Sequence, residues 1–534
     1  MRLAPIPSIR PWTLLLLLLT GLAPLAAAQW QTGVGGNAAR DGLTTSYGPQ
    51  EAQIAWQGSR PTLFAQQAVV AEGLVVVSRT ESFTIPTGTW IVAHELATGD
   101  ERWAVQLPYD FPGSSWRSRV SAIRDGQVYA SRSGNTNEDY LYALDPADGS
   151  ILWRSEALIG EGSTESLAFA PNGDPIAGSM NALTRIDHTN GQTVWSVARS
   201  CPTSDGALAS VYGNRAYIWE ASPSGPVVTA FDLDQGARLF SSAAIGGGLV
   251  QQLGLFCGPD GTVYAPRTQN NPATDFFVAL ADTGGGFAEK WRLPLGYVPF
   301  ASFAVGPDGS VYSYDRETDP ELSILRLDPE SGAVLDKSPG IRVNWPAKPR
   351  LAIDALGTVY CTNGSYDQGA LYAFTADLLT LWSESVPGVN LGGPALAANG
   401  TLIVCGTGTD LRAYAGSSGS VVDDAWREAT PGWVRLEPSA PNPFRSATAI
   451  AFELPSGASI GAQVLDAQGR VVRHLLPPRF MPHGRHELQW DGRDDRGRAC
   501  QSGVYLVRLR PGHPQAGASA GSPHTVVEKL VLSR

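Results

Sequence analysis

The sequence has few cysteines, few histidines and only one sizeable apolar run. That run, around Leu14–Leu19, is shorter than the roughly 20 residues that a membrane-spanning helix needs, so we expect no transmembrane segment. The five cysteines include no adjacent pair and no CxxC or CxxxC spacing. This absence argues against a zinc or redox site and favours buried thiols or incidental disulfides.

Basic charge is also scarce, because 39 Lys and Arg residues face 50 Asp and Glu residues, for a net charge of -11. Such a balance argues against a nucleic-acid partner, which would draw on clustered cations. The seven histidines form no evident catalytic set. Two G-x-S-x-G patterns, at Ser459 and Ser519, lack the strand-to-helix turn of an esterase. The sequence therefore favours a non-catalytic protein over an enzyme, and we assign no catalytic residue and no metal ligand.

Residues 1–28 have the features of an export signal. Arg2 and Arg10 supply positive charge, Leu14–Leu19 supplies the apolar core, and Ala26–Ala28 supplies the small residues that a signal peptidase requires. No cysteine follows directly, so we expect no lipid anchor. The sequence thus predicts an exported protein that is periplasmic, on the cell surface or extracellular.

A short motif consisting of a glycine turn and a strand recurs eight times. Successive copies start 40 to 53 residues apart, at Gly73, Gly126, Gly173, Gly213, Gly261, Gly309, Gly357 and Gly400. An all-strand repeat of this period is typical of four-stranded propeller blades. We therefore predict an all-β fold in which residues 29–428 form an eight-bladed β-propeller. Ile54–Gln57 resembles the last strand of a repeat that is otherwise absent, and is expected to close the ring.

Most repeats close on a large side chain, which we interpret as packing between neighbouring blades rather than as a cofactor platform. These closing residues are Trp103, Trp153, Trp195, Phe240, Trp291, Leu335 and Trp382.

The pattern changes after a Pro-containing linker, residues 429–437. Longer alternating strands follow, such as Thr448–Pro455 and Gly503–Arg510, separated by glycine turns. About 100 residues in this form predict a small β-sandwich over 438–534. Trp490 is expected to fill its core.

The unit Leu141–Trp153, LYALDPADGSILW, resembles the repeat of PQQ-like β-propellers, and Trp30–Gly42 is similar to the initial segment of that group. The resemblance implies a fold shared by quinoprotein dehydrogenases and by non-catalytic scaffolds such as the outer-membrane β-barrel assembly lipoprotein. The dehydrogenases hold their quinone between a tryptophan and a vicinal disulfide, beside a calcium ion bound by Glu, Asn and Asp. This sequence has no adjacent cysteines and no evident calcium set. We therefore expect no PQQ and no other cofactor.

The last 100 residues resemble the Ig-like domain of flagellar hook-capping (FlgD-type) proteins and the related sorting domains of type IX secretion cargo. The matching motifs are Pro441–Phe444, Val464–Leu475 and Gly484–Gly492. The resemblance implies a role in sorting or attachment, with export machinery as a partner. The sequence leaves open whether the domain is a sorting signal that is cleaved off or a permanent module.

Two loops that lead into the first strands of blades, residues 107–122 and 338–352, concentrate basic and aromatic side chains at the predicted channel mouth. We expect these residues to bind an anionic or sugar-like ligand, or an acidic segment of a protein partner. Arginine side chains would donate paired hydrogen bonds, and aromatic rings would pack against the ligand. The candidate binding residues are Trp116, Arg117, Arg119, Tyr297, Arg342, Trp345, Lys348 and Arg350.

Two functions of different classes follow. The first is a non-catalytic binding or scaffolding protein of the cell envelope or exterior, whose sandwich serves for sorting or attachment. The alternative is an extracellular polysaccharide hydrolase or lyase with its site at the channel mouth. A cluster of carboxylates at the mouth would favour the hydrolase, because glycoside hydrolysis generally uses a pair of them.

Overall fold

A computed structural model describes most of the chain after the expected export signal, and its secondary-structure elements are all β-strands. The chain divides into two compact units, 1–417 and 418–534. The described residues are 30–84, 87–109, 115, 117–134, 138–160, 165–200, 208–246, 254–267, 275–296, 301–315, 321–344, 347–416, 435–437, 439–454, 458–466, 471–481, 484–495, 497–511 and 526–533.

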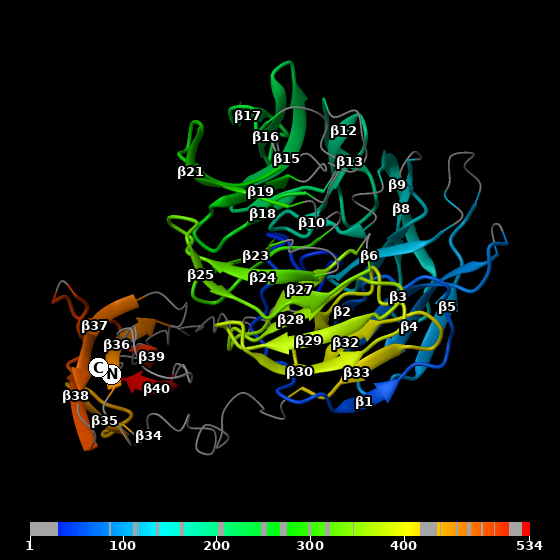
Figure 1. The fold of residues 1–534 in the computed structure, drawn as a ribbon. Helices are drawn as coiled ribbons and strands as arrows, with labels where there is room; N and C mark the ends of the chain where they lie inside the picture. The colour runs from blue at the N-terminus through cyan, green and yellow to red at the C-terminus, as the bar shows by residue number, and fades with distance from the viewer. Residues whose placement is uncertain are drawn as a thin grey trace, which may run out of the picture. The chain divides into compact units, whose positions relative to one another are not determined.

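The described part of the first unit contains eight antiparallel sheets (Figure 1). Seven of them follow the chain order from the innermost to the outermost strand. The first four of these consist of β2 (Val69–Ala71), β3 (Leu74–Thr80), β4 (Thr89–Glu95) and β5 (Glu101–Val105); β6 (Arg119–Arg124), β7 (Gln127–Ser131), β8 (Asp139–Leu144) and β9 (Ile151–Ile159); β10 (Ala168–Phe169), β11 (Pro175–Gly178), β12 (Ala182–Ile186) and β13 (Thr193–Ala198); and β14 (Ser210–Tyr212), β15 (Arg215–Ser222), β16 (Gly225–Asp232) and β17 (Arg238–Ser241).

The next three sheets follow the same plan, and the eighth recruits a strand from the N-terminal side of the chain. Their strands are β18 (Phe256–Cys257), β19 (Val263–Arg267), β20 (Phe276–Asp282) and β21 (Phe287–Pro294); β22 (Ala304–Val305), β23 (Val311–Asp315), β24 (Glu321–Leu327) and β25 (Val334–Lys337), with β26 (Ile341–Arg342) on β24; β27 (Arg350–Ile353), β28 (Val359–Thr362), β29 (Ala370–Phe374) and β30 (Thr380–Ser385); and β31 (Ala395–Leu396), β32 (Leu402–Cys405), β33 (Leu411–Tyr414) and β1 (Ile54–Gln57).

The sheets surround a centre as propeller blades do. The first strands of several neighbouring sheets lie side by side, as in β2–β6, β10–β14, β14–β18 and β22–β27, and β31 of the last sheet also lies beside β2 of the first. Burial falls from the centre outward, since all seven residues of β3 are buried whereas β13 alternates between half-buried and exposed positions. The inner strands are therefore continuous apolar runs and the outer strands are amphipathic, as a radial stack of sheets requires.

The strand β1 lies at the outer edge of the last sheet. It pairs antiparallel with β33, and Trp56 is opposite Ala413. Because β1 precedes the first blade in the chain while β33 belongs to the last one, this pairing joins the two ends of the ring.

Tryptophans at the outer strands join five of the described sheets to the following one. An indole N–H donates to a carbonyl oxygen in a turn of the following sheet at 2.8–2.9 Å, in the pairs Trp56 to Leu96, Trp103 to Pro146, Trp153 to His188, Trp195 to Leu233 and Trp291 to Pro329. Phe240 packs instead against Phe287 of the following sheet, with 5.1 Å between ring centroids. Trp382 packs against Tyr414 of the following sheet, with 5.8 Å between ring centroids. The interpretation of these closing residues as packing between blades is confirmed for all of them except Leu335. Leu335 is 44% exposed, because Asp336 lies opposite Arg326 in the place that Trp153 takes opposite Ala143.

The N-terminal segment (Trp30–Ser46) runs around the inside of the ring. It is hydrogen-bonded through the backbone to seven innermost strands, at Val70, Ile123, Val211, Cys257, Val305, Ile353 and Leu396. At the remaining blade, Ser166 beside β10 donates its hydroxyl to the carbonyl of Val34 at 3.0 Å. The segment thus satisfies backbone groups that the innermost strands would otherwise leave unpaired at the channel.

The second unit is a two-sheet sandwich with its own core. Its sheets are β34 (Arg435–Leu436), β35 (Thr448–Leu454) and β38 (Gly484–Trp490), and β37 (Val471–Met481), β36 (Ala458–Asp466), β39 (Gly503–Pro511) and β40 (Val526–Leu532). Trp490 fills the core as expected, with no exposed surface, and its ring centroid lies 4.9 Å from that of Tyr505. The end of the expected linker 429–437 belongs to this sandwich, because β34 pairs with β35. In the described part of the chain, no helix is long and apolar enough to cross a membrane.

Candidate functional site

Chain direction decides which side chains meet at the channel mouth. The innermost strands all run the same way along the channel, so their first residues lie at one end of it. Arg119 begins β6 and Arg350 begins β27. The N-terminal segment is hydrogen-bonded to later residues of the same strands, Ile123 and Ile353. The two arginines therefore lie at the mouth, and the N-terminal segment lies below them.

Both arginines face one carboxylate, Glu165, which precedes β10. Nη1 of Arg119 lies 3.2 Å from one carboxylate oxygen of Glu165, and Nη2 of Arg350 lies 3.8 Å from the other. The side chain of Arg350 is 1% exposed and that of Glu165 is 17% exposed. Three blades thus contribute charged groups to one small volume with little access to water, where each charge acts more strongly than at the surface.

The floor of this site is also basic. Arg40 of the N-terminal segment is buried and donates to the carbonyl oxygens of Val34 and Leu255 at 3.4 and 3.3 Å. Burial, followed by the repulsion of Arg350, lowers the pKa of Arg40, while Glu165 opposes this shift. A guanidinium nevertheless stays charged at neutral pH.

Two further cations complete the cluster. Burial lowers the pKa of Lys348, Glu165 opposes that change, and the charges of Arg350, Arg119 and Arg117 lower the pKa further. The guanidinium carbon of Arg117 lies 4.5 Å from the centre of the Phe64 ring, within cation–π range. We call the five cations Arg40, Arg117, Arg119, Lys348 and Arg350, together with Glu165, the basic mouth.

The predicted binding residues separate into three groups. Arg117, Arg119, Lys348 and Arg350 come together in the basic mouth. Arg342 does not, because it is exposed on β26, where its backbone pairs with Glu321 of β24. Trp116, Tyr297 and Trp345 lie outside the described residues.

Sequence reasoning missed Glu165, Arg40 and a supporting residue, Arg132. Nε of Arg132 donates to the carbonyl of Leu107 at 3.1 Å, and its Nη1 donates to the hydroxyl of Thr89 at 3.3 Å. Arg132 thus holds the start of the loop that carries Arg117. The repeat contains a pattern that would have found it, because arginine occupies the sixth place after the opening glycine in three repeats, at Arg79, Arg132 and Arg267. No comparable pattern marks Glu165.

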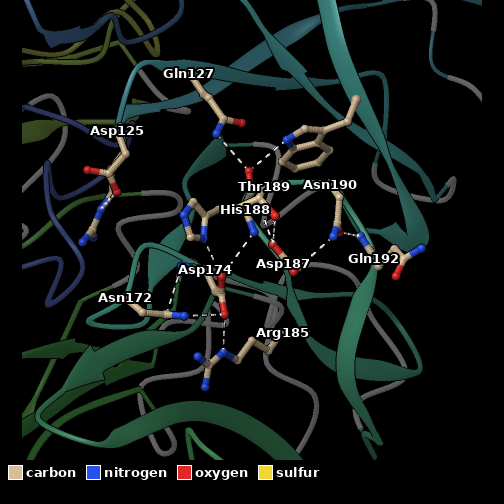
Figure 2. A network of polar contacts seen from close by, with 12 residues as sticks. Asp125, Gln127, Asn172, Asp174, Arg185, Asp187, His188, Thr189, Asn190 and Gln192 are labelled. Atoms are coloured by element: carbon tan, nitrogen blue, oxygen red, sulfur yellow. Dashed lines mark hydrogen bonds and ion pairs between the residues drawn. The ribbon is translucent and has the colours of Figure 1, made fainter.

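A second polar cluster, around Asp174, is built for structure rather than for binding a metal. Asp174, Asp187 and His188 have ligand atoms close enough for one ion. However, Figure 2 shows the Asp174 carboxylate facing His188, Asn172 and Arg185, whose side-chain nitrogens lie 2.7–2.8 Å from its oxygens. Burial would raise the pKa of Asp174, but these hydrogen bonds hold it at about 2. The guanidinium of Arg185 already supplies the positive charge that a cation would bring.

Comparisons with known proteins agree with this architecture. The PQQ_2 family, described as outer membrane protein assembly factor BamB, matches residues 87–335, and the FlgD Ig-like domain family matches residues 441–511. No curated protein matches the chain significantly.

Among solved structures, the chain is similar to the quinohemoprotein alcohol dehydrogenase from Comamonas testosteroni, with 14% identity, a TM-score of 0.52, and coverage of 74% of this chain and 82% of that one. A europium-containing methanol dehydrogenase gives 12% identity, a TM-score of 0.52, and coverage of 71% and 90%. BamB from Moraxella catarrhalis gives 16% identity, a TM-score of 0.38, and coverage of 63% and 94%. The chain thus combines a PQQ-like β-propeller with a C-terminal FlgD-type Ig-like domain.

Proposed function

We propose that this chain is an exported, non-catalytic binding and scaffolding protein of the cell envelope or exterior. In this proposal the propeller is the interaction platform, and the Ig-like sandwich serves for sorting or attachment. The main observation that supports this proposal is the basic mouth, where Arg119 and Arg350 both face the carboxylate of Glu165. Such a concentration of positive charge is suited to receive negative charge from a ligand or a partner.

The composition of the mouth supports binding over hydrolysis. Glycoside hydrolysis generally requires two carboxyl groups about 5–10 Å apart, one to protonate the leaving group and one to act as nucleophile or base. Of the described residues, Glu165 is the carboxylate that contacts the arginines of the basic mouth, and both of its oxygens face a guanidinium.

The two family matches support a role in the envelope. The PQQ_2 description names an assembly factor of outer-membrane proteins, and the second match is to the Ig-like domain of FlgD. The first description refers to the outer membrane. It agrees with the export signal predicted at residues 1–28.

The first experiment is to measure the intact mass and cellular fraction of the natively produced protein. The proposal expects the protein in the envelope, on the surface or in the medium. A mass lacking about 100 C-terminal residues would identify the sandwich as a removable sorting domain, and a full-length mass would identify it as a permanent module. Full-length protein retained in the cytoplasm would contradict the proposal.

The second experiment tests the platform itself. A photo-crosslinking residue at Phe83, which is 66% exposed and lies 5.8 Å from the Phe64 ring beside Arg117, should give adducts with a discrete partner in living cells. The same residue at Val334, which is 55% exposed on the outer strand β25, is the matched control and should not. Depolymerisation of a polysaccharide by the purified protein, abolished by Lys348→Gln, would instead establish the enzyme alternative.

A further inference from the structure

Arg350 is buried with part of its hydrogen-bonding capacity unused. The residue is 1% exposed, and its Nε and Nη1 atoms have no hydrogen-bond partner in the described structure. Its Nη2 atom lies 3.8 Å from Glu165, beyond hydrogen-bond range. A buried guanidinium in this state is unfavourable unless a further acceptor completes it.

A second unused donor lies beside it. Arg350 and Thr362 face each other in the register of β27 and β28, and the Thr362 hydroxyl is likewise buried without a partner among the described residues. Gly393 packs closely against the same side, since a β-carbon there would lie 2.2 Å from Cβ of Arg350 and 3.5 Å from the Thr362 hydroxyl. Backbone without a side chain therefore packs directly against this pair of donors.

The charged groups around Arg350 are mostly positive. Arg119, Lys348 and Arg40 act on this volume together with Arg350, whereas Glu165 contributes the opposing charge. One carboxylate cannot neutralise four cations. An anion that binds here would gain from each of these cations and would be repelled by Glu165.

We propose that the basic mouth contains a specific oxyanion subsite, in which Arg350 and Thr362 bind one carboxylate, phosphate or sulfate group and Arg119 and Lys348 add attraction. Glu165 acts as an internal competitor that partly neutralises the empty subsite. This inference rests on the proposed binding function and specifies its ligand chemistry. The group belongs either to a small free anion or to an acidic peptide segment, which share this chemistry.

The test is calorimetric titration of the full-length protein at low ionic strength. The probes are inorganic phosphate, sulfate, citrate and a hexaglutamate peptide. At least one should bind with a single site, and the affinity should fall as sodium chloride is added, because salt screens the attraction. Citrate or phosphate binding without hexaglutamate binding identifies a small-molecule subsite, and the opposite result identifies a peptide subsite.

Two variants make the test specific. Arg350→Met removes the donors and should weaken binding at least about 30-fold, which is the scale of a lost charged hydrogen-bond donor. Glu165→Gln removes the competing charge and should strengthen binding about tenfold. Arg342→Gln is the matched control, because this arginine is exposed on β26 and no contact in the described structure joins its side chain to Glu165.

The melting temperature separates ligand binding from folding. If Arg350 only stabilises the fold, Arg350→Met lowers the melting temperature of the unliganded protein. Each anion should then shift the melting temperature by the same amount in all variants. If the subsite exists, the unliganded variant stays folded, and the rise in melting temperature that the best probe gives to the unmodified protein is lost.

Should Arg350→Met fail to fold, Glu165→Gln decides alone, since unchanged or weaker binding in that variant overturns the inference. Absence of binding by all four probes also overturns it. The proposed function would still stand if the adducts from position 83 persisted, so the two failures are distinguishable.

Discussion

At the scale of single residues, the joints between blades depend on glycines that lie under tryptophans. Trp153 packs over Gly191 in the next sheet, where a β-carbon would lie 2.6 Å from Cε3 of the indole, and Gly191 has a φ of +77°. Gly126 has a similar φ of +71°, but no atom lies within 4 Å of its added β-carbon. This pair separates the backbone requirement for glycine from the packing requirement.

We therefore expect Gly191→Ala to be much more costly than Gly126→Ala. Gly126→Ala should cost about 1–2 kcal/mol, because an L side chain is disfavoured at positive φ. Gly191→Ala adds an overpacking cost of about 1–3 kcal/mol, so that its total is about 2–5 kcal/mol. Thermal denaturation of both variants checks the difference, and equal losses would show that the indole yields to the methyl group.

Asp174 should make the propeller sensitive to acid. The carboxylate is buried and hydrogen-bonded with Arg185, Asn172 and His188, and its pKa is about 2 instead of the usual 3.8. A lowered pKa in the folded state contributes stability that is fully present above about pH 4 and is lost as the pH falls toward 2. Asp174→Asn should thus cost about 2 kcal/mol at pH 7, and its deficit should shrink between pH 4 and pH 2.

Melting temperatures of the unmodified protein and Asp174→Asn across this pH range provide the measurement. Asp187→Asn is the control, because Asp187 mainly accepts hydrogen bonds from exposed residues of its own turn, Thr189 and Asn190. A deficit for Asp174→Asn that stays constant down to pH 2 would show that its origin is steric rather than electrostatic.

At the scale of elements, β1 differs from the other outer strands because it is far in sequence from the rest of its sheet. It is attached through β33 and through Trp56, whose indole donates to Leu96 of the first sheet at 2.8 Å. Trp153 makes the same kind of joint in the middle of the ring, with a bond of 2.9 Å to His188. Both indoles are 9% exposed, so they form a matched pair.

Alanine at either tryptophan should lower stability by about 3–5 kcal/mol, since both create a large cavity and leave a carbonyl without its donor. Only Trp56→Ala should also release a strand, because β1 can detach from the edge while the remaining blades stay closed on themselves. Hydrogen exchange followed by mass spectrometry should then show fast exchange at Ala55–Gln57 in Trp56→Ala and slow exchange in Trp153→Ala. Equal protection of β1 in the two variants would argue that the pairing with β33 is sufficient.

The elements were largely predictable because they obey a local rule. Each blade repeats a glycine turn, an apolar inner strand and a bulky closing residue, so its strands are encoded within about 45 residues of sequence. Leu335 shows where the rule fails, because the strand register places Asp336 in the closing position opposite Arg326 and leaves Leu335 44% exposed. A bulky residue near the end of a repeat therefore does not by itself identify the closing position.

The functional residues were less predictable because they meet only through closure of the ring. Arg119 and Arg350 come from loops that composition singled out, whereas Glu165 meets them from a third blade without any local pattern. Arg40 reaches the mouth because the N-terminal segment follows the inside of the ring through contacts that are distant in sequence. Such contacts depend on the topology of the whole ring, so the sequence of a single repeat cannot predict them.

At the scale of the whole molecule, the two units have independent cores. The largest hydrophobic clusters of the propeller consist of residues 30–414, and those of the sandwich consist of residues 436–532. Units with separate cores unfold as separate cooperative transitions, because the loss of packing in one does not expose the core of the other. We therefore expect two transitions when the full chain is heated in a calorimeter.

Two core variants assign these transitions. Trp490 is fully buried in the sandwich, so Trp490→Ala should lower one transition by about 3–5 kcal/mol of stability and leave the other within about 1 °C. Trp153→Ala should lower the other transition and leave the first unchanged, because its indole joins two blades of the propeller. A single transition, or one that shifts in both variants, would mean that the sandwich stabilises the propeller. In that case, removal of the sandwich after export would weaken the binding platform instead of releasing it intact.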